Sequence, residues 1–361
     1  MLTKVKGGVK LNIAFIGFGG VGQALAQILL EKNHHLNEKY GLNTKIVAVS
    51  DVMKGSVYDP EGLNIEDLLS SVKEKGSVEE YPDSSTVQKG LNSIQTIEDT
   101  NADMIVEVTF TDVETGQPAI DHCETAFQKG KSVVTTNKGP AAVKLNSLLK
   151  LAEENGAFFG FEGTVMSGTP ALRLPETTLA GNDIREVVGI LNGTTNYILT
   201  EMEKGLSFED SLKQAQSLGY AEADPTNDVE GYDVRYKAAI LANYVLGEEV
   251  SAKEIHCEGI RSVSQDMVQD ALDEGKRWKL LARIKKEDGK VEATVQPEKI
   301  EMTNPLAGVT GATNAILYDC DLAGPIMLTG AGAGLKETGF SLLIDIIHAH
   351  LESKKQTSGV R

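Results

Sequence analysis

Short apolar runs alternate with longer amphipathic stretches over the first half of the chain. The runs typical of strands are 11–16, 45–49, 104–108, 132–135 and 157–161, and helices are expected over 24–30, 112–128 and 141–154. Such alternation is typical of a parallel sheet covered by helices on both faces. The polar stretch 51–101 shows no period that would order it. The pattern therefore predicts an α/β fold for this part of the chain.

The pattern changes after residue 162. Longer helical spans occupy 193–204, 208–217 and 231–246, strands are expected at 292–297, 314–318 and 325–328, and a closing helix at 338–351 follows the glycine-rich turn TGAGAG. This mixture predicts a second domain of α+β type. We expect the first domain to cover 1–161 with 320–361 returning to it, and the second to cover 162–319.

Composition narrows the class of protein. A length of 361 residues suits two domains, and a hydrophobic content of 41% is enough for two cores. The net charge of −17 argues against a nucleic-acid partner, which requires a basic face. No apolar run approaches the ~20 residues that span a bilayer, and the N-terminus lacks the apolar stretch of a secretion signal. Three cysteines without paired or metal-like spacing favour a reducing compartment, so a cytoplasmic location is expected.

A glycine motif follows the first expected strand and opens the first helix. Gly17 permits a tight turn, Gly19 lets the backbone approach a pyrophosphate, and Gly22 allows close packing of helix on strand. The free N–H groups of the helix N-terminus favour an anion. The motif predicts dinucleotide binding by Gly17, Phe18, Gly19, Gly20, Val21 and Gly22. The alternative is a glycine-rich turn without a ligand.

Asp51 ends the second expected strand, where an acidic side chain can bond both ribose hydroxyls of NAD. It lies further past Gly22 than usual because an insertion precedes the strand. Lys54 could serve a 2′-phosphate instead. The sequence therefore favours NAD slightly over NADP, and the alternative role for Asp51 is to cap a turn.

Polar residues also follow two later strands of the expected sheet. Thr109 comes after the strand at 104–108, and Asn137 and Lys138 come after the strand at 132–135. Ligands of open α/β sheets bind at this carboxyl edge. We assign all three to the cofactor site, with Lys138 near the reacting carbonyl. The alternative for Lys138 is a surface lysine.

An acidic segment, YAEADPTNDVEGYDVRYK, carries the remaining candidate chemistry. Its charged residues are Glu222, Asp224, Asp228, Glu230, Asp233 and Lys237, and an apolar helix follows at once. Carboxylates beside a partly buried lysine suit a small zwitterion whose hydroxyl must exchange a proton, because lysine can carry that proton and a carboxylate can accept from an ammonium group. The alternatives are a surface ion pair between Asp233 and Lys237 and solvated capping roles for Asp224 and Glu230.

Taken together, GFGGVG, TTNKGP, EGTVMSGTP, NGTTNYIL, GYAEADPTNDVEGYDVRYK and TGAGAGLKET resemble homoserine dehydrogenase in order and approximate spacing. The resemblance extends from residue 11 to about residue 351 and is weakest over 52–100 and 251–304. It implies a Rossmann-type dinucleotide-binding domain, a substrate-binding and dimerisation domain, and a homodimer. It also implies reversible NAD(P)-dependent interconversion of L-homoserine and L-aspartate 4-semialdehyde, a step of threonine, methionine and isoleucine biosynthesis.

The resemblance carries residue roles as well. Lys237 and Lys138 match the two lysines of the reaction, with Asp233 beside them; which one transfers the proton stays open. The substrate would be held by Glu222, Asp228, Gly193 and Thr194. The turn at Gly332 and Gly334, with Glu337, would return to the nucleotide. A monovalent cation such as sodium would be held by Glu162, Val165, Ser167 and Thr169, mostly through carbonyl oxygens.

Several alternatives remain. Larger family members carry a C-terminal regulatory domain or a fused kinase, and nothing here resembles either. The chain could oxidise another amino or hydroxy acid, or bind a dinucleotide as a sensor without turnover. The presence of both lysines favours catalysis. Cys123 beside His122 is a weak candidate thiol nucleophile, because adjacent residues of a helix do not face each other.

Overall fold

The computed structural model describes residues 9–358, so the N-terminal residues considered above as a secretion signal lie largely outside the described part. The chain divides into two compact units. Unit 1 comprises Met1–Thr164 and Leu335–Arg361, and unit 2 comprises Val165–Gly334. Each unit has its own sheet and its own apolar core.

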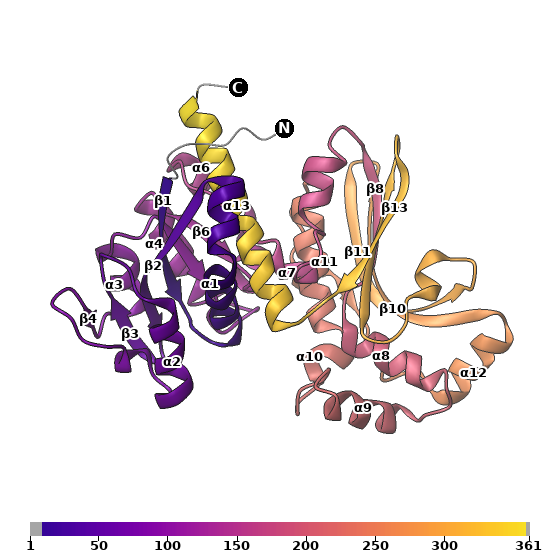
Figure 1. The fold of residues 1–361 in the computed structure, drawn as a ribbon. Helices are drawn as coiled ribbons and strands as arrows, with labels where there is room; N and C mark the ends of the chain where they lie inside the picture. The colour runs from indigo at the N-terminus through magenta and orange to yellow at the C-terminus, as the bar shows by residue number, and fades with distance from the viewer. Residues whose placement is uncertain (1–8, 359–361) are drawn as a thin grey trace. The chain divides into compact units, whose positions relative to one another are not determined.

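The sheet of unit 1 has the order β4-β3-β2-β1-β5-β6-β7 (Figure 1). Its strands are β1 (Val9–Ile16), β2 (Leu42–Asp51), β3 (Gly55–Tyr58), β4 (Gln88–Lys89), β5 (Met104–Glu107), β6 (Ser132–Thr135) and β7 (Phe159–Gly160). The five strands from β2 to β7 in this order are parallel, whereas β3 and β4 pair antiparallel at one edge. The strand order reverses between β1 and β5, which is where such sheets bind ligands.

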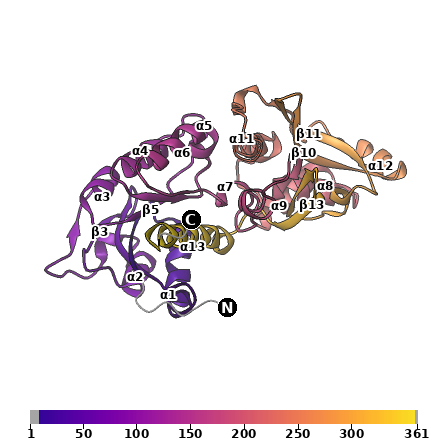
Figure 2. The same ribbon diagram turned by 90° about the horizontal axis from the view of Figure 1, so that it is seen from above.

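Helices cover both faces of this sheet, as Figure 2 shows. They are α1 (Gly20–Tyr40), α2 (Ile65–Lys75), α3 (Ser93–Asp99), α4 (Ala119–Gln128), α5 (Lys138–Val143), α6 (Leu145–Glu154) and α13 (Leu335–Ser358), with the short η1 (Val78–Glu80). Apolar residues of β1, β2 and β5 form the core together with α1 and α13. The predicted Rossmann-type parallel sheet is confirmed.

Two local expectations were incomplete or wrong. The stretch 51–101, which the pattern could not order, contains β3, α2, β4 and α3. The helix expected over 112–128 begins only at Ala119, because the carboxylate of Asp112 accepts the N–H groups of Glu114 and Thr115 in a turn. Gly116 follows with a φ of 73°, a conformation outside the helical region.

Unit 2 is built on a mainly antiparallel sheet with the order β13-β12-β8-β10-β11-β9. Its strands are β8 (Ile184–Ile190), β9 (His256–Cys257), β10 (Lys276–Glu287), β11 (Lys290–Glu301), β12 (Thr313–Cys320) and β13 (Gly324–Ala331). The helical segments are α7 (Gly163–Met166), which crosses the unit boundary, η2 (Leu174–Thr178), α8 (Gly193–Met202), α9 (Phe208–Ser217), α10 (Thr226–Val229), α11 (Tyr232–Val245), η3 (Ala252–Glu254), α12 (Gln265–Asp273) and η4 (Pro305–Gly308). Helices α8 and α11 both pack against β10. The second, α+β unit is therefore confirmed as an architecture.

The unit boundaries differ from the expected ones. Unit 1 extends to Thr164, and the chain returns to it at Leu335 rather than at 320. The reason is that β13 pairs antiparallel with β12 along its whole length, which keeps 320–334 in the sheet of unit 2. Within the described residues, no helix combines the length and apolarity needed to cross a membrane.

Candidate active site

The glycine turn of unit 1 is tightly enclosed at Gly17. This residue has a φ of 91°, and a Cβ there would lie 2.5 Å from the carbonyl oxygen of Val108. Only glycine fits such a conformation and contact without strain. A Cβ on Gly22 would lie 3.1 Å from the oxygen of Gly17, so helix and strand are also close here. Both glycines are where the motif predicts them to be necessary.

The start of α1 is open by comparison. Gly19 is its N-cap. Among the residues that the structure describes, no side chain caps the helix, and none lies within 4 Å of a Cβ placed on Gly19. Uncapped N–H groups beside open space form the kind of helix terminus that binds phosphates. The side chain of Leu335, the first residue of α13, lies against Gly20. Glu337 stands in the first turn of α13, while Gly334 is the last residue of unit 2 and Gly332 packs on Asn314 there.

Asp51 binds the glycine turn directly. Its Oδ2 accepts the N–H of Phe18 at 2.7 Å, and its Oδ1 accepts the N–H groups of Met53 and Lys54 at 2.9 and 3.0 Å. The ammonium of Lys54 lies 3.7 Å from Oδ2. Asp51 therefore caps the turn that follows β2. It also anchors the glycine turn through Phe18, a role that the sequence did not indicate. Whether Asp51 also bonds a ribose stays a prediction.

Glu107, at the end of β5, is a buried carboxylate that the sequence analysis missed. It accepts from the backbone and hydroxyl of Thr109, and from the hydroxyl of Thr135 at 3.2 Å. Nδ1 of His122 lies 3.4 Å from its Oε1. This residue therefore links the carboxyl ends of β5 and β6. The feature of the sequence that could have indicated this site is an acidic residue at the end of an otherwise apolar run.

Asn137 joins the loops that follow β5 and β6. Its Nδ2 donates to the carbonyl of Phe110 at 3.2 Å, and its Oδ1 caps α5 by accepting the N–H of Gly139 at 3.0 Å. Lys138 is half-buried and is the first residue of α5 rather than the end of a strand. Both residues therefore stand at the carboxyl edge of the sheet of unit 1, as expected.

Cys123 is unsuited to act as a nucleophile. Burial raises the pKa of its thiol well above the ordinary value, and the nearby Glu107 carboxylate raises it further. Since the thiolate is the reactive form, a buried thiol with a raised pKa is inert. His122 contacts Glu107 and Ser93 instead.

In unit 2, Asn192 brings together two of the predicted carboxylates. Its Nδ2 donates to Oδ1 of Asp228 at 2.7 Å and to Oδ2 of Asp233 at 3.1 Å. Its Oδ1 accepts the N–H of Thr195 at 2.9 Å and so caps α8. Asn192 immediately precedes Gly193. Asn192 was not among the predicted site residues, because asparagine before a helix indicates only a cap.

Lys237 and Asp233 form a buried ion pair one turn apart on α11. Nζ of Lys237 lies 2.7 Å from Oδ2 of Asp233, and the side chains are 9% and 15% exposed. The ammonium also donates to the carbonyl oxygen of Leu191 at 2.7 Å. The alternative of a surface ion pair is therefore wrong.

Asp228 has a perturbed acidity. Burial raises the pKa of its carboxyl, and the neighbouring Asp233 carboxylate raises it further, while hydrogen bonds from Asn192 and Thr194 and the charge of Lys237 oppose the rise. A carboxylate that is partly desolvated beside a second carboxylate gains from a cationic partner. The cluster of Asn192, Asp228, Asp233 and Lys237 is hereafter called the acidic cluster.

The first turn of α8 borders the acidic cluster. A Cβ on Gly193 would lie 2.7 Å from the carbonyl of Ala312, and the hydroxyl of Thr194 donates to the carbonyl of Tyr220 at 2.5 Å. Glu222 is exposed, and the described hydrogen bonds at this residue use its backbone carbonyl, which accepts from Gln216. The structure thus brings Gly193 and Thr194 to the cluster but does not join the Glu222 side chain to it.

Asp224 and Glu230 have the alternative roles given above. Asp224 is exposed and accepts the N–H and hydroxyl of Thr226, which lowers its pKa. Glu230 pairs with Arg261. Neither carboxylate belongs to the acidic cluster. The capping interpretation agrees with the contacts of Asp224, whereas Glu230 is half-buried in an ion pair.

The expected cation loop has two unusual residues. Ser167 is buried and has a φ of 51°, in the left-handed region that non-glycine residues seldom adopt. Thr169 packs closely against Gly330. Glu162 is buried in unit 1, where its N–H donates to Asp345, and Val165 is buried in unit 2. Among the described residues, no three His, Cys, Asp or Glu side chains lie together so that they could hold a metal ion. The expected site would use mainly backbone carbonyl oxygens, which do not depend on such a group of side chains. The cation site stays a prediction.

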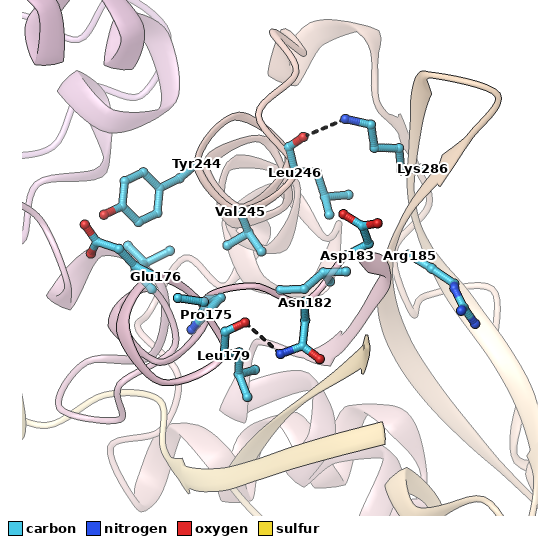
Figure 3. A pocket seen from close by; sticks show the side chains of 13 residues that line it. Pro175, Glu176, Leu179, Asn182, Asp183, Arg185, Tyr244, Val245, Leu246 and Lys286 are labelled. Carbon is cyan, nitrogen blue, oxygen red and sulfur yellow. Dashed lines mark hydrogen bonds between the residues drawn. The ribbon is translucent and has the colours of Figure 1, made fainter. Parts of the chain in front are cut away.

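A cavity of about 670 Å³ lies elsewhere in unit 2 (Figure 3). It is lined by residues of η2, of the following turn, of β8 and β10, and by the end of α11, where Tyr244, Val245 and Leu246 lie. Lys286 closes one side by donating to the carbonyl of Leu246 at 3.2 Å. Lys237 lies near the other end of α11, so this cavity is not part of the acidic cluster.

Comparison with known proteins adds to this geometry. Residues 170–347 match the family model for homoserine dehydrogenase, and residues 1–113 match the model for glutamate/leucine/phenylalanine/valine dehydrogenase. An NAD(+)-dependent homoserine dehydrogenase from Pseudomonas canavaninivorans is 44% identical over 346 residues, covering 96% of this chain and 97% of that protein.

Solved structures agree. A homoserine dehydrogenase from Thiobacillus denitrificans superposes with a TM-score of 0.83 at 30% identity, covering 97% of this chain and 75% of that one. A hyperthermophilic archaeal homoserine dehydrogenase mutant in complex with NADPH gives a TM-score of 0.81 at 31% identity, covering 95% and 98%.

Proposed function

The chain belongs to the homoserine dehydrogenase family, and we propose that unit 1 binds the dinucleotide while the acidic cluster of unit 2 binds and deprotonates the amino-acid substrate. The protein is an oxidoreductase that interconverts L-homoserine and L-aspartate 4-semialdehyde with a nicotinamide dinucleotide. The observation that carries the residue assignment is the buried ion pair of Lys237 and Asp233, held by Asn192 beside Asp228.

Lys237 is the residue that we assign to proton transfer. Oxidation of the substrate alcohol removes a hydroxyl proton as hydride leaves the carbon, and reduction returns a proton to the carbonyl oxygen. The Lys237 nitrogen is held in one position by Asp233 and by the carbonyl of Leu191. In the oxidation direction it accepts the hydroxyl proton as the neutral amine, and in the reduction direction it donates that proton to the carbonyl oxygen as the ammonium. The same charge stabilises the developing oxyanion.

Asp228 is the proposed acceptor for the substrate ammonium. It is desolvated and repelled by Asp233, so a bound cation relieves an unfavourable interaction. Gly193 and Thr194 present the first turn of α8 to the substrate carboxylate, since a helix N-terminus favours an anion. Glu222 is exposed and is proposed to act at the rim of the substrate site.

The dinucleotide is assigned to the carboxyl edge of unit 1. The open N-terminus of α1 at Gly19 fits a pyrophosphate, since no side chain of the described part of the chain caps it. Thr109, Asn137 and Lys138 stand after β5 and β6, where we place the nicotinamide. When bound, that ring supplies the hydride acceptor; Lys138 would orient and polarise the substrate oxygen. Gly334 and Glu337 are proposed to complete the nucleotide site.

We propose NAD as the preferred cofactor. The carboxylate of Asp51 carries a negative charge where a 2′-phosphate would need a cation, and Lys54 is already 3.7 Å from that carboxylate. The most similar relative named above is NAD-dependent, whereas the archaeal mutant was seen with NADPH. A sodium ion at 162–169 is proposed as well, supported by the left-handed backbone at Ser167.

A homodimer through unit 2 is proposed. The outer strand β13 has pairing partners on one side only, and its Ile326, Met327 and Leu328 are half-exposed. Apolar residues on an unpaired edge strand favour association with another chain. Light scattering coupled to size exclusion tests this proposal. A cytoplasmic location is proposed from the three free cysteines of the described residues.

The test of the function is reduced-cofactor formation from L-homoserine, measured separately with NAD and NADP. We expect turnover with L-homoserine, little with D-homoserine, and a higher kcat/KM for NAD. Dinucleotide binding without turnover on L-homoserine would move the assignment to another substrate or to a sensor. A preference for NADP would overturn only the cofactor proposal.

A further inference from the structure

A second polar cavity of unit 2 lies at the far end of α8 from the acidic cluster. Its volume is about 450 Å³, and its lining residues are Thr200, Glu201, Glu203, Lys204, Leu272, Arg277, Thr310 and Gly311. Gly193 and Met202 are the first and last residues of α8, which are about 14 Å apart along the helix axis. The cavity is therefore distinct from the substrate half-site.

Unlike charges alternate around this cavity. Nζ of Lys204 lies 2.7 Å from Oε1 of Glu201, and Nε of Arg277 lies 3.5 Å from Oε2 of Glu203. Two carboxylates and two cations therefore line one hollow. A ligand with a single charge would meet a repelling group, whereas a ligand that carries both charges finds a partner for each.

The second ion pair has unused hydrogen-bonding capacity. The side chain of Glu203 is only 10% exposed, and its Oε1 is enclosed without a hydrogen-bond partner among the described residues. The same is true of Nε of Arg277. Burial raises the pKa of the Glu203 carboxyl, while the charges of Lys279 and Arg277 oppose the rise. A buried carboxylate oxygen without a donor is unusual in folded proteins, and a ligand N–H group that reached Glu203 would supply the missing donor.

The backbone around the cavity also favours a ligand that carries both charges. Glu203 is the C-cap of α8, and the C-terminal end of a helix carries partial negative charge that favours a cation. Nη1 of Arg277 donates to the carbonyl of Ala307 at 2.9 Å, which fixes the guanidinium at the cavity wall. The cavity thus has an anionic end at Glu203 and a fixed cation beside it.

We propose that this cavity binds a small zwitterionic α-amino acid, with its ammonium group at Glu203 and its carboxylate at Arg277. The site stands independently of the substrate assignment. Its lining loop also touches the substrate half-site: Asn196 on α8 donates to the carbonyls of Val309, Gly311 and Thr313, and the carbonyl of Ala312 lies against Gly193.

The single tryptophan of the chain provides a local probe. Trp278 follows Arg277 on β10, and its indole N–H donates to the carbonyl of Met267 on α12, the helix that contributes Leu272 to the cavity. The experiment titrates the full chain with each of the twenty common L-amino acids, and with propionate and ethylammonium as single-charge controls. Trp278 fluorescence and calorimetry are read in parallel.

Three variants locate the binding. Thr310→Phe fills the cavity from an exposed position, Glu203→Gln removes the proposed ammonium acceptor, and Thr303→Phe introduces the same ring at an exposed threonine outside the cavity. Asp228→Asn impairs the substrate half-site. Circular dichroism and thermal melting check that each variant is folded.

We expect saturable binding of at least one amino acid and none of the single-charge controls. Thr310→Phe and Glu203→Gln should each weaken it at least about 10-fold, while Thr303→Phe and Asp228→Asn leave it within about 2-fold. The proposal is overturned if no amino acid gives a saturable signal in either readout. It is also overturned if the signal survives Thr310→Phe, or disappears in Asp228→Asn, which would assign the binding to the substrate half-site.

Discussion

Nζ of Lys237 lies 2.7 Å from Oδ2 of Asp233, and both side chains are largely buried. Residues at i and i+4 of an exposed helix form pairs that contribute only about 0.2–0.5 kcal/mol. Here Asp233 also accepts a hydrogen bond from the Asn192 amide, and Lys237 also donates to the Leu191 carbonyl, so neither partner reorients freely. A cationic group held in this way is suited to proton transfer, because its position does not depend on the substrate.

Asn192→Ser tests whether the amide positions the two carboxylates. Serine still caps α8, but it lacks the Nδ2 donor to Asp228 and Asp233. We expect the KM for L-homoserine to rise at least about 10-fold, because two hydrogen bonds to charged groups are lost and each contributes about 1.5–3 kcal/mol. Because the Asn192 bond lowers the pKa of Asp228, the acid limb of kcat/KM should also move to higher pH.

A purely structural role for Asn192 predicts a different result. The melting temperature would fall while the pH profile stayed in place. Asn182→Ser is the matched control, since that asparagine bonds the backbone of Leu179 and Ala323 far from the acidic cluster.

Asp228→Asn should weaken substrate binding and stabilise the fold. The ordinary pKa of this group is 3.8, and burial and Asp233 raise it in the folded protein. A carboxyl with a raised folded pKa contributes stability below its unfolded pKa, and this stability is lost as pH rises through the folded pKa. At neutral pH the ionised carboxylate therefore destabilises the fold, and the variant should melt at a higher temperature.

The catalytic activity of Asp228→Asn should fall, although its stability should rise. Loss of the charge that meets the substrate ammonium should lower kcat/KM about 10- to 100-fold. In the wild type, kcat/KM should fall with decreasing pH as Asp228 gains a proton, and the variant should lose this acid limb. An unchanged acid limb in Asp228→Asn would assign the titration to another group. Thermal melts at pH 5 and pH 8, with steady-state kinetics, provide both measurements.

Gly17→Ala and Gly19→Ala should separate folding from cofactor binding. At Gly17 the added methyl would lie 2.5 Å from the Val108 carbonyl at a φ of 91°, so we expect a loss of at least about 1–3 kcal/mol in the free energy of unfolding. At Gly19 the methyl meets nothing within 4 Å. That variant should unfold like the wild type in urea but bind the dinucleotide less tightly. If Gly19→Ala binds the dinucleotide as tightly as the wild type does, the pyrophosphate does not bind at the N-terminus of α1.

Asp51→Ala should weaken NAD binding more than NADP binding. The variant removes the acceptor that fixes the Phe18 N–H and the negative charge proposed to face the ribose. We expect the Kd for NAD to rise about 10-fold, as for loss of a hydrogen bond to a charged group. Lys54→Met is the companion variant and should affect NADP alone. Equal weakening of both dinucleotides by Asp51→Ala would leave only its role in anchoring the turn.

The sequence predicts the parallel strands of unit 1 because each contains a short apolar run that is buried, such as Ile13–Ile16 of β1 and Ile46–Val49 of β2. The glycine turn was also predictable from the spacing of its glycines after a strand, although the contact that requires glycine at Gly17 comes from Val108, just after the distant strand β5. The long strand β10 was not predicted. Its Lys279, Arg283 and Lys285 interrupt the apolar pattern that would indicate a strand. Lys279 is nevertheless fully buried, where it donates to Asn196 and to the Val309 carbonyl.

The acidic segment was predictable as a candidate site, but its internal arrangement was not. Asp224, Asp228, Glu230 and Asp233 are alike in the sequence. Only tertiary contacts separate the two clustered carboxylates from Asp224, which caps a turn, and from Glu230, which pairs with Arg261. Asn192 contributes from a position 36 residues before Asp228. Such long-range hydrogen bonds leave no local pattern.

The most direct test of the account is the kcat of Lys237→Met with L-homoserine, measured with the Kd for NAD by titration. Lys213→Met is the control, because that lysine is 76% exposed on α9. We predict a kcat loss of about 100- to 10,000-fold in Lys237→Met, the usual contribution of a general acid or base, with the NAD Kd unchanged and the control fully active. A Lys237→Met variant that retains most of its kcat would contradict the assignment of proton transfer to the acidic cluster.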